Sequence, residues 1–157
     1  MTEGGRNIRG GERIGHTPVL LHEVLAILQP TSGGIFLDCT VGAGGHAEAI
    51  LEAARPTSRV VGIDRDPEAI AVARNRLARF RDRAALVCGD YRELPNLASE
   101  LQLGAISGVI FDLGVSSLQL DDPSRGFSFS MEGPLDMRFD RESGGPSVRD
   151  LLHELRR

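Results

Sequence analysis

Four carboxylates recur along the sequence, each at the end of a short apolar run. They are Asp38, Asp64, Asp90 and Asp112. Short apolar runs without polar alternation are typical of parallel strands buried on both faces, and the carboxyl ends of such strands meet at one edge of a sheet. Ligands of open α/β sheets bind at that edge, so we expect these side chains to surround a ligand. An acidic rim favours a cationic ligand over a pyrophosphate.

A glycine-rich turn, DCTVGAGGH from Asp38 to His46, follows the first apolar run and precedes a helical pattern. Gly42 allows a tight turn, while Gly44 and Gly45 allow a ligand to approach the backbone at the positive end of a helix. The G-x-G-G spacing is shorter than the full dinucleotide fingerprint. Two other interpretations are compatible with this motif alone. It could be a structural turn that binds no ligand, or the cofactor turn of a nicotinamide-dependent oxidoreductase.

The residues after the second and third strands point to a nucleoside. Asp64 ends the second strand, where a carboxylate can accept both hydroxyls of a ribose. Asp66 is expected to cap the following helix, which would leave Asp64 free for a ligand. The ring of Tyr91 can pack on an adenine whose amino group donates to Asp90. Together with the acidic rim, these features favour S-adenosylmethionine.

Strand and helix patterns alternate four times along the chain. The expected strands cover 35–39, 59–64, 84–90 and 106–114, and the expected helices cover 17–28, 46–54, 66–80 and 93–103. In the first helix Thr17 is the expected cap and Pro18 the first helical residue. The alternation predicts an α/β fold with a doubly wound parallel sheet. The long polar segment 115–147 is typical of a functional loop, and Ser147 is expected to cap a last helix.

The bulk properties exclude several classes of protein. No apolar run of the 157 residues reaches membrane-spanning length, and residues 1–15 lack the apolar core of a secretory signal, so we expect a flexible tail there. The net charge of −4 does not indicate a general nucleic-acid binder. Cys39 and Cys88 are expected to be buried thiols in a reducing cytoplasm, and no spacing of residues indicates a metal site.

Five motifs together closely resemble the RsmH/MraW family. The motifs are GGH, IDRDP, DLGVSSLQLDD, RGFSF and GPLDMR. Members are Rossmann-like class I methyltransferases that use S-adenosyl-L-methionine to methylate N4 of a cytosine in small-subunit (16S) ribosomal RNA. The resemblance runs from about His16 to Leu155. It implies cofactor contacts at Gly44, Gly45, His46, Asp64, Tyr91, Asp112 and Gln119.

Family members are about twice as long as this chain. The resemblance therefore implies a cofactor-binding core over 16–114, and an active-site loop with the start of a substrate domain over 115–157. It also implies a sheet that stops after the fourth strand, whose exposed edge favours self-association. The alternative to an active methyltransferase is an inactive cofactor-binding fragment or interaction module.

The expected reaction needs an acceptor for the hydrogens of the cytosine amine, because its lone pair is delocalised into the ring. Asp112 is the candidate catalytic residue, although it could instead only hold the cofactor. Arg125 and Arg138 could contact the phosphates of ribosomal RNA or of an assembling small subunit, while Phe127 or Phe129 stacks on a base. Alternatively, the phenylalanines pack the loop onto the domain.

Overall fold

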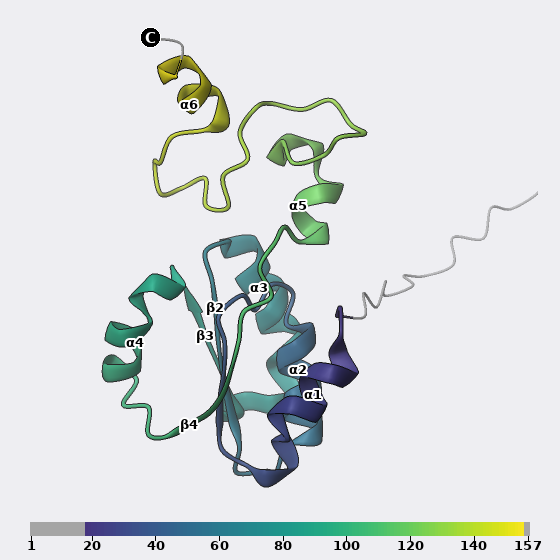
Figure 1. Ribbon diagram of the computed structural model, residues 1–157, viewed down its shortest axis with the longest axis vertical. Helices are drawn as coiled ribbons and strands as arrows, with labels where there is room; N and C mark the ends of the chain where they lie inside the picture. Colours follow the sequence, from purple (N-terminus) through teal and green to yellow (C-terminus); the bar gives the residue numbers. More distant parts are fainter. Residues whose placement is uncertain (1–17, 156–157) are drawn as a thin grey trace, which may run out of the picture.

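The protein folds around a four-stranded, all-parallel sheet in the computed structural model, which describes residues 18–155 (Figure 1). The strands are β1 (Ile35–Asp38), β2 (Arg59–Asp64), β3 (Ala84–Cys88) and β4 (Ile106–Ile110), in the order β3-β2-β1-β4. The predicted tail, residues 1–15, and the predicted helix cap Thr17 lie outside the described residues.

The strand register brings the carboxyl ends of the four strands to one edge, as predicted. Asp38 pairs with Ile110, and Asp64 pairs with Cys88. β3 and β4 are shorter than predicted, because each ladder ends where its partner strand ends.

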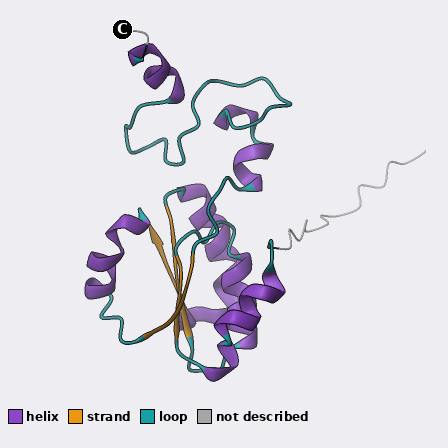
Figure 2. Ribbon diagram, in the orientation of Figure 1, coloured by secondary structure: helices purple, strands orange, loops and turns teal. Residues whose placement is uncertain are grey.

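Helices cover both faces of the sheet, which confirms the doubly wound α/β architecture (Figure 2). Figure 1 shows α1 (Leu21–Leu28), α2 (Gly45–Ala53) and α3 (Pro67–Leu77) on one side and α4 (Leu94–Glu100) on the other. Short 3₁₀ turns occupy Pro30–Ser32, Ala78–Arg83, Tyr91–Glu93 and Pro123–Arg125.

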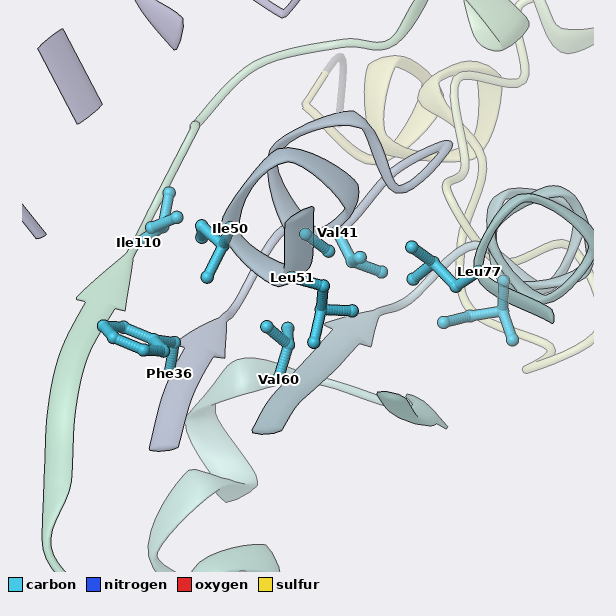
Figure 3. Close-up of a cluster of buried hydrophobic side chains, with 9 residues drawn as sticks. Phe36, Val41, Ile50, Leu51, Val60, Leu77 and Ile110 are labelled. Atoms are coloured by element: carbon cyan, nitrogen blue, oxygen red, sulfur yellow. The ribbon is translucent and has the colours of Figure 1, made fainter. Parts of the chain in front are cut away.

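The main hydrophobic core fills the space between the sheet and α2 and α3 (Figure 3). Its buried side chains include Phe36, Ile50, Leu51, Val60, Ile70 and Leu77. The opposite face carries a smaller cluster of Leu37, Cys39 and Val61, which Leu94 and Leu103 partly cover. Neighbouring residues of a strand point to opposite faces, so one short apolar strand supplies both layers.

The predicted start of the first helix is wrong. α1 begins at Leu21, and Leu20 precedes it in a left-handed conformation with 64% of its surface exposed. Pro18 lies against Gly45, where a Cβ atom would come 2.5 Å from the proline ring. The carbonyl of Val19 lies 3.1 Å from the His46 ring nitrogen Nε2. These contacts hold residues 18–19 as a turn over the start of α2, so the helix begins later.

The segment expected to be a loop contains regular structure above the carboxyl edge of the sheet (Figure 1). It includes α5 (Ser117–Asp121) and leads to α6 (Val148–Glu154). Ser147 caps α6 as predicted, in a capping box with Asp150. The prediction of two buried cysteines is half right: Cys39 is buried, whereas Cys88 is exposed, because it ends the edge strand β3.

Candidate functional site

The glycine turn is tied to the end of β2 through Asp64. The amide of Gly42 donates to Asp64 Oδ2 at 2.8 Å, and the amide of Asp66 donates to Oδ1 at 2.9 Å. Asp66 takes the capping role as predicted, while both oxygens of Asp64 already accept a hydrogen bond within the fold. Each oxygen keeps a further lone pair, so Asp64 can still accept hydrogen bonds from a ligand.

The glycines of the turn also meet packing needs of the fold itself. Gly44 has a φ of +83°, and a Cβ there would lie 3.4 Å from the backbone of Ala73 on α3. Gly45 lies under Pro18, as described above. Both residues let α2 start close to its neighbours, which makes them necessary for the fold whether or not a ligand binds.

Asp38 is a buried acid that lies directly before this turn. Its side chain is 1% exposed; Oδ1 accepts from the Thr40 amide at 3.3 Å, and Oδ2 has no partner among residues 18–155. Burial raises its pKa to about 7, and the charges of Asp64 and Asp112 add to the rise. A buried, unpaired carboxyl oxygen beside two further acids can accommodate a cationic ligand.

Asp112 lies on the exposed side of the same edge, just beyond β4. Its amide donates to Thr40 Oγ1 at 2.7 Å, which fixes the backbone, while its side chain is 54% exposed. The nearest basic group is His46, whose Nδ1 lies 3.8 Å from Asp112 Oδ2. His46 is buried at the start of α2. The Asp112 carboxylate therefore points where a substrate can reach it.

A hollow of about 220 Å³ lies at the ends of β2 and β3. Its lining residues are Arg65, Cys88, Gly89, Asp90 and Asp140. Asp90 is paired with Arg92, which donates to its carboxylate at 2.6 and 2.9 Å and lowers its pKa to about 2. Beside it Tyr91, 38% exposed, contacts the ring of Phe111 edge-on at 5.5 Å. This aromatic pair offers a surface for a base.

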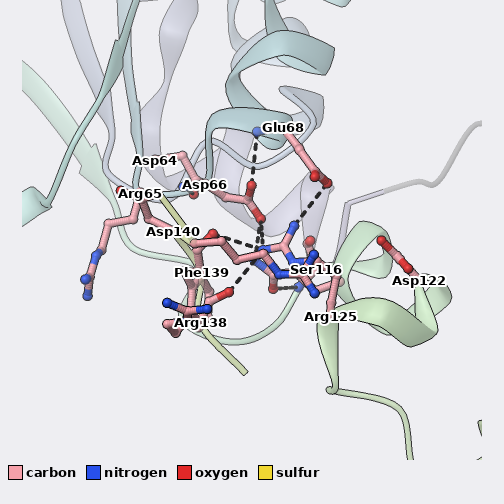
Figure 4. A network of polar contacts seen from close by, with 12 residues as sticks. Asp64, Arg65, Asp66, Glu68, Ser116, Asp122, Arg125, Arg138, Phe139 and Asp140 are labelled. Carbon is pink, nitrogen blue, oxygen red and sulfur yellow. Dashed lines mark hydrogen bonds and ion pairs between the residues drawn. The ribbon is translucent and has the colours of Figure 1, made fainter. Parts of the chain in front are cut away.

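Arg125 lies in a buried polar network with Asp66 and Glu68 (Figure 4), and Gln119 joins this network through Asp66. Gln119 donates from Nε2 to Asp66 Oδ2 at 3.0 Å and accepts from the Ser116 amide at 2.9 Å. Arg125 is 1% exposed and donates to Asp66 at 2.7 Å and to Glu68 at 3.0 Å. The predicted contact of Arg125 with RNA phosphate is therefore wrong, because its guanidinium is enclosed by acids of the fold.

The other candidate RNA contacts separate into buried and exposed groups. Arg138 pairs with Asp136 of its own segment at 2.8 Å. Phe127 is buried and packs edge-on against Phe139 at 5.6 Å, so the packing alternative is confirmed for it. Phe129 is fully exposed, so it is free to stack on a base. Sequence reasoning missed Thr40, whose hydroxyl joins the glycine turn to Asp112.

We expect the raised pKa of Asp38 to give unfolding a pH dependence. Its folded pKa of about 7 lies above the ordinary aspartate value of 3.8, so its favourable contribution to stability is complete below 3.8 and is lost as pH rises through about 7. Over the whole titration the free energy of unfolding falls by about 4 kcal/mol. Urea unfolding at pH 5, 6, 7 and 8 measures the slope.

The variant Asp38→Asn removes this titration, so its pH slope should be shallower than that of the wild type. Asp82→Asn, which changes an exposed acid at the other end of the sheet, is the control and should keep the wild-type slope. Identical slopes in all three proteins would contradict the assignment.

Within residues 18–155, no group of three or more His, Cys, Asp or Glu side chains is arranged to hold a metal ion. In the same part of the chain, no helix is long and apolar enough to span a membrane.

A parallel sheet with helices on both faces and a glycine turn after β1 defines the Rossmann-like class. The family model described as the MraW methylase family matches residues 13–157. The chain belongs to this family.

Curated relatives carry the name ribosomal RNA small subunit methyltransferase H. The protein of Sorangium cellulosum is 50% identical over 140 residues, which are 89% of this chain and 44% of that protein. The protein of Heliobacterium modesticaldum is also 50% identical over 140 residues, with 88% and 44% covered. The chain thus spans less than half the length of these relatives.

Among solved structures, an rRNA methylase from Streptococcus thermophilus is similar with a TM-score of 0.48 and 21% identity. The match covers 66% of this chain and 58% of that chain.

Proposed function

We propose that this chain is the cofactor-binding part of an S-adenosylmethionine-dependent methyltransferase that methylates N4 of a cytosine in small-subunit ribosomal RNA. The observation that carries the proposal is the gathering of Asp38, Asp64 and Asp112 around the glycine turn, in a chain of the MraW methylase family. The relatives' names support ribosomal RNA as the substrate. The proposed partner is small-subunit ribosomal RNA or an assembling small subunit, and the proposed location is the cytoplasm.

The residues present fit S-adenosylmethionine, which would supply an electrophilic methyl group on a sulfonium centre. The unpaired Oδ2 of Asp38 and the exposed carboxylate of Asp112 suit a ligand with positive charge. Asp64 would accept from the ribose hydroxyls, and Tyr91 would pack on the adenine. The start of α2 at Gly44, Gly45 and His46 would lie against the methionine end of the cofactor.

Gln119 takes a supporting place in this proposal. The resemblance implies a direct cofactor contact, but both ends of its amide are engaged, by Asp66 and by Ser116. We therefore assign Gln119 to holding Asp66, and through it the end of β2.

Asp112 is the proposed acceptor for the amine hydrogens of the target cytosine. An acceptor there localises the lone pair of the nitrogen and orients it toward the methyl group. The bound amine is then held in a near-attack geometry. The same carboxylate can hold the proton that the amine loses on methylation. Phe129, which is exposed in the part of the chain after β4, supplies an aromatic face for RNA.

We expect Asp64→Asn to raise the Kd for S-adenosylmethionine by about 10- to 100-fold, because a charge-assisted hydrogen bond contributes about 1.5–3 kcal/mol. Asparagine keeps one acceptor for the turn, so the variant should fold. Calorimetric titration measures the Kd, and circular dichroism verifies the fold. A folded variant with the wild-type Kd would remove Asp64 from the cofactor site.

Nucleoside mass spectrometry tests the proposed reaction. A chimaera in which this chain replaces the matching 44% of the Sorangium cellulosum relative would be incubated with the cofactor and unmethylated small subunits. The expected product is N4-methylcytidine. A different methylated nucleoside, or no methylation where the intact relative methylates its substrate, would overturn the proposal.

Self-association through the sheet edge stays a prediction. β4 has a neighbour only on its β1 side among the described strands, and Ile106 and Val109 are 40% and 42% exposed. Sedimentation velocity over a range of concentrations should show a rising average mass. A constant monomer mass would contradict this expectation.

A further inference from the structure

The buried Arg125 ties one segment of the chain to the start of α3. We define this part, residues 115–141, as the 115–141 segment. The guanidinium donates to Asp66 Oδ2 at 2.7 Å and to Glu68 Oε2 at 3.0 Å, both at the start of α3. Arg125 and Asp66 are each 1% exposed, so the pair lies out of solvent.

The same acid connects this pair to the glycine turn. Asp66 caps α3 by accepting from the Glu68 amide at 3.0 Å, and its own amide donates to Asp64. Asp64 in turn accepts from the Gly42 amide. A continuous chain of hydrogen bonds therefore runs from Arg125 through Asp66 and Asp64 to the turn.

Arg125 also shapes the part of the segment that borders the hollow. Its guanidinium donates to the carbonyls of Arg138 at 3.2 Å and Phe139 at 2.9 Å. The next residue, Asp140, lines the hollow at the ends of β2 and β3 together with Arg65 and Asp90. One buried side chain thus fixes a wall of the hollow and the acid that organises the end of β2.

We propose that Arg125 is a positioning residue that couples docking of the 115–141 segment to cofactor binding. The inference rests on the proposed function, since it assumes that S-adenosylmethionine binds at this edge. Docking by Arg125 completes the hollow with Asp140 and steadies Asp64 through Asp66. Cofactor binding and docking of the segment then stabilise each other, because a coupling between two sites acts in both directions.

The test compares four variants with the wild-type chain. Arg125→Met removes the guanidinium, and Arg125→Met with Asp66→Asn removes both buried charges, which guards against misfolding from one unpaired charge. Glu68→Gln weakens one contact at an exposed residue and should fold without difficulty. The matched control is Arg138→Gln, because the contacts of that side chain lie within 136–145.

Two readouts are taken at a temperature at which each variant is folded. They are the Kd for S-adenosylmethionine and the hydrogen exchange of residues 134–141 with and without the cofactor. We expect both Arg125 variants to raise the Kd by about tenfold or more, and to lose the slowing of exchange that the cofactor causes in the wild type. Glu68→Gln should show a smaller change in the same direction, and Arg138→Gln should match the wild type.

The outcomes separate the two proposals. The coupling is overturned if a folded Arg125 variant keeps both the wild-type Kd and the cofactor-dependent slowing of exchange. If the Arg125 variants do not fold, the same result in Glu68→Gln overturns it. In either case the proposed function stays intact. A purely structural anchor predicts this result. A wild-type chain that is folded but binds no S-adenosylmethionine overturns the cofactor assignment, and the coupling with it.

Discussion

Asp112→Ala is expected to lower the rate of methyl transfer by about 10²- to 10⁴-fold, the usual effect of removing a group that orients or accepts a proton. The Kd for S-adenosylmethionine should rise by a much smaller factor, because the contact with the amine acts on the transition state, whereas the attraction between the exposed Asp112 carboxylate and the charge of the cofactor is weakened by solvent. The reason is structural. The backbone of Asp112 is held by Thr40, so the substitution leaves the strand end in place, and its half-exposed carboxylate faces outward.

Single-turnover transfer of labelled methyl groups measures the rate, in the chimaera that carries this chain, and calorimetry measures the Kd. Asp82→Ala, an exposed acid at the opposite end of the sheet, should leave both quantities unchanged. Equal losses of rate and of affinity in Asp112→Ala would instead support a residue that only holds the cofactor.

Arg125→Met should lower the free energy of unfolding by about 3–5 kcal/mol, which is typical when one partner of a buried ion pair is removed. The substitution leaves the Asp66 carboxylate, 1% exposed, with Gln119 as its remaining side-chain donor. Adding Asp66→Asn removes the uncompensated charge and should restore most of the loss. Urea unfolding of the two variants gives both values.

Arg138→Met provides the comparison on the same segment. Its ion pair with Asp136 is local and partly exposed, so its loss should cost less than about 1 kcal/mol. Equal costs for the Arg125 and Arg138 variants would show that burial of the Arg125–Asp66 pair contributes little to stability.

The sheet and the edge that carries the site could be predicted because their signals are local. The run IFL is continuous and apolar, and the structure buries its last two residues together with Asp38, which follows them. The sequence predicts that Asp66 caps the helix that starts with Pro67, and the structure confirms this cap on α3. Once the strands are parallel, alternation alone brings Asp38 and Asp64 to one edge.

The contacts that the sequence did not reveal are formed between distant residues. Arg125 lies 59 positions from Asp66, and nothing around it distinguishes a buried guanidinium from a surface one. The sequence does not reveal that Asp64 accepts from the Gly42 amide, because that amide belongs to another turn, 22 positions away. The late start of α1 similarly depends on contacts of Pro18 and Val19 with α2. Such tertiary contacts override the local preferences that a sequence pattern reports.

Calorimetric titration of this chain with S-adenosylmethionine tests the central claim most directly, with a nicotinamide dinucleotide titrated in parallel. We predict saturable one-to-one binding of S-adenosylmethionine and no binding of the dinucleotide. A chain that is folded by circular dichroism but gives no heat with S-adenosylmethionine at sub-millimolar protein, or that binds the dinucleotide instead, would contradict the claim.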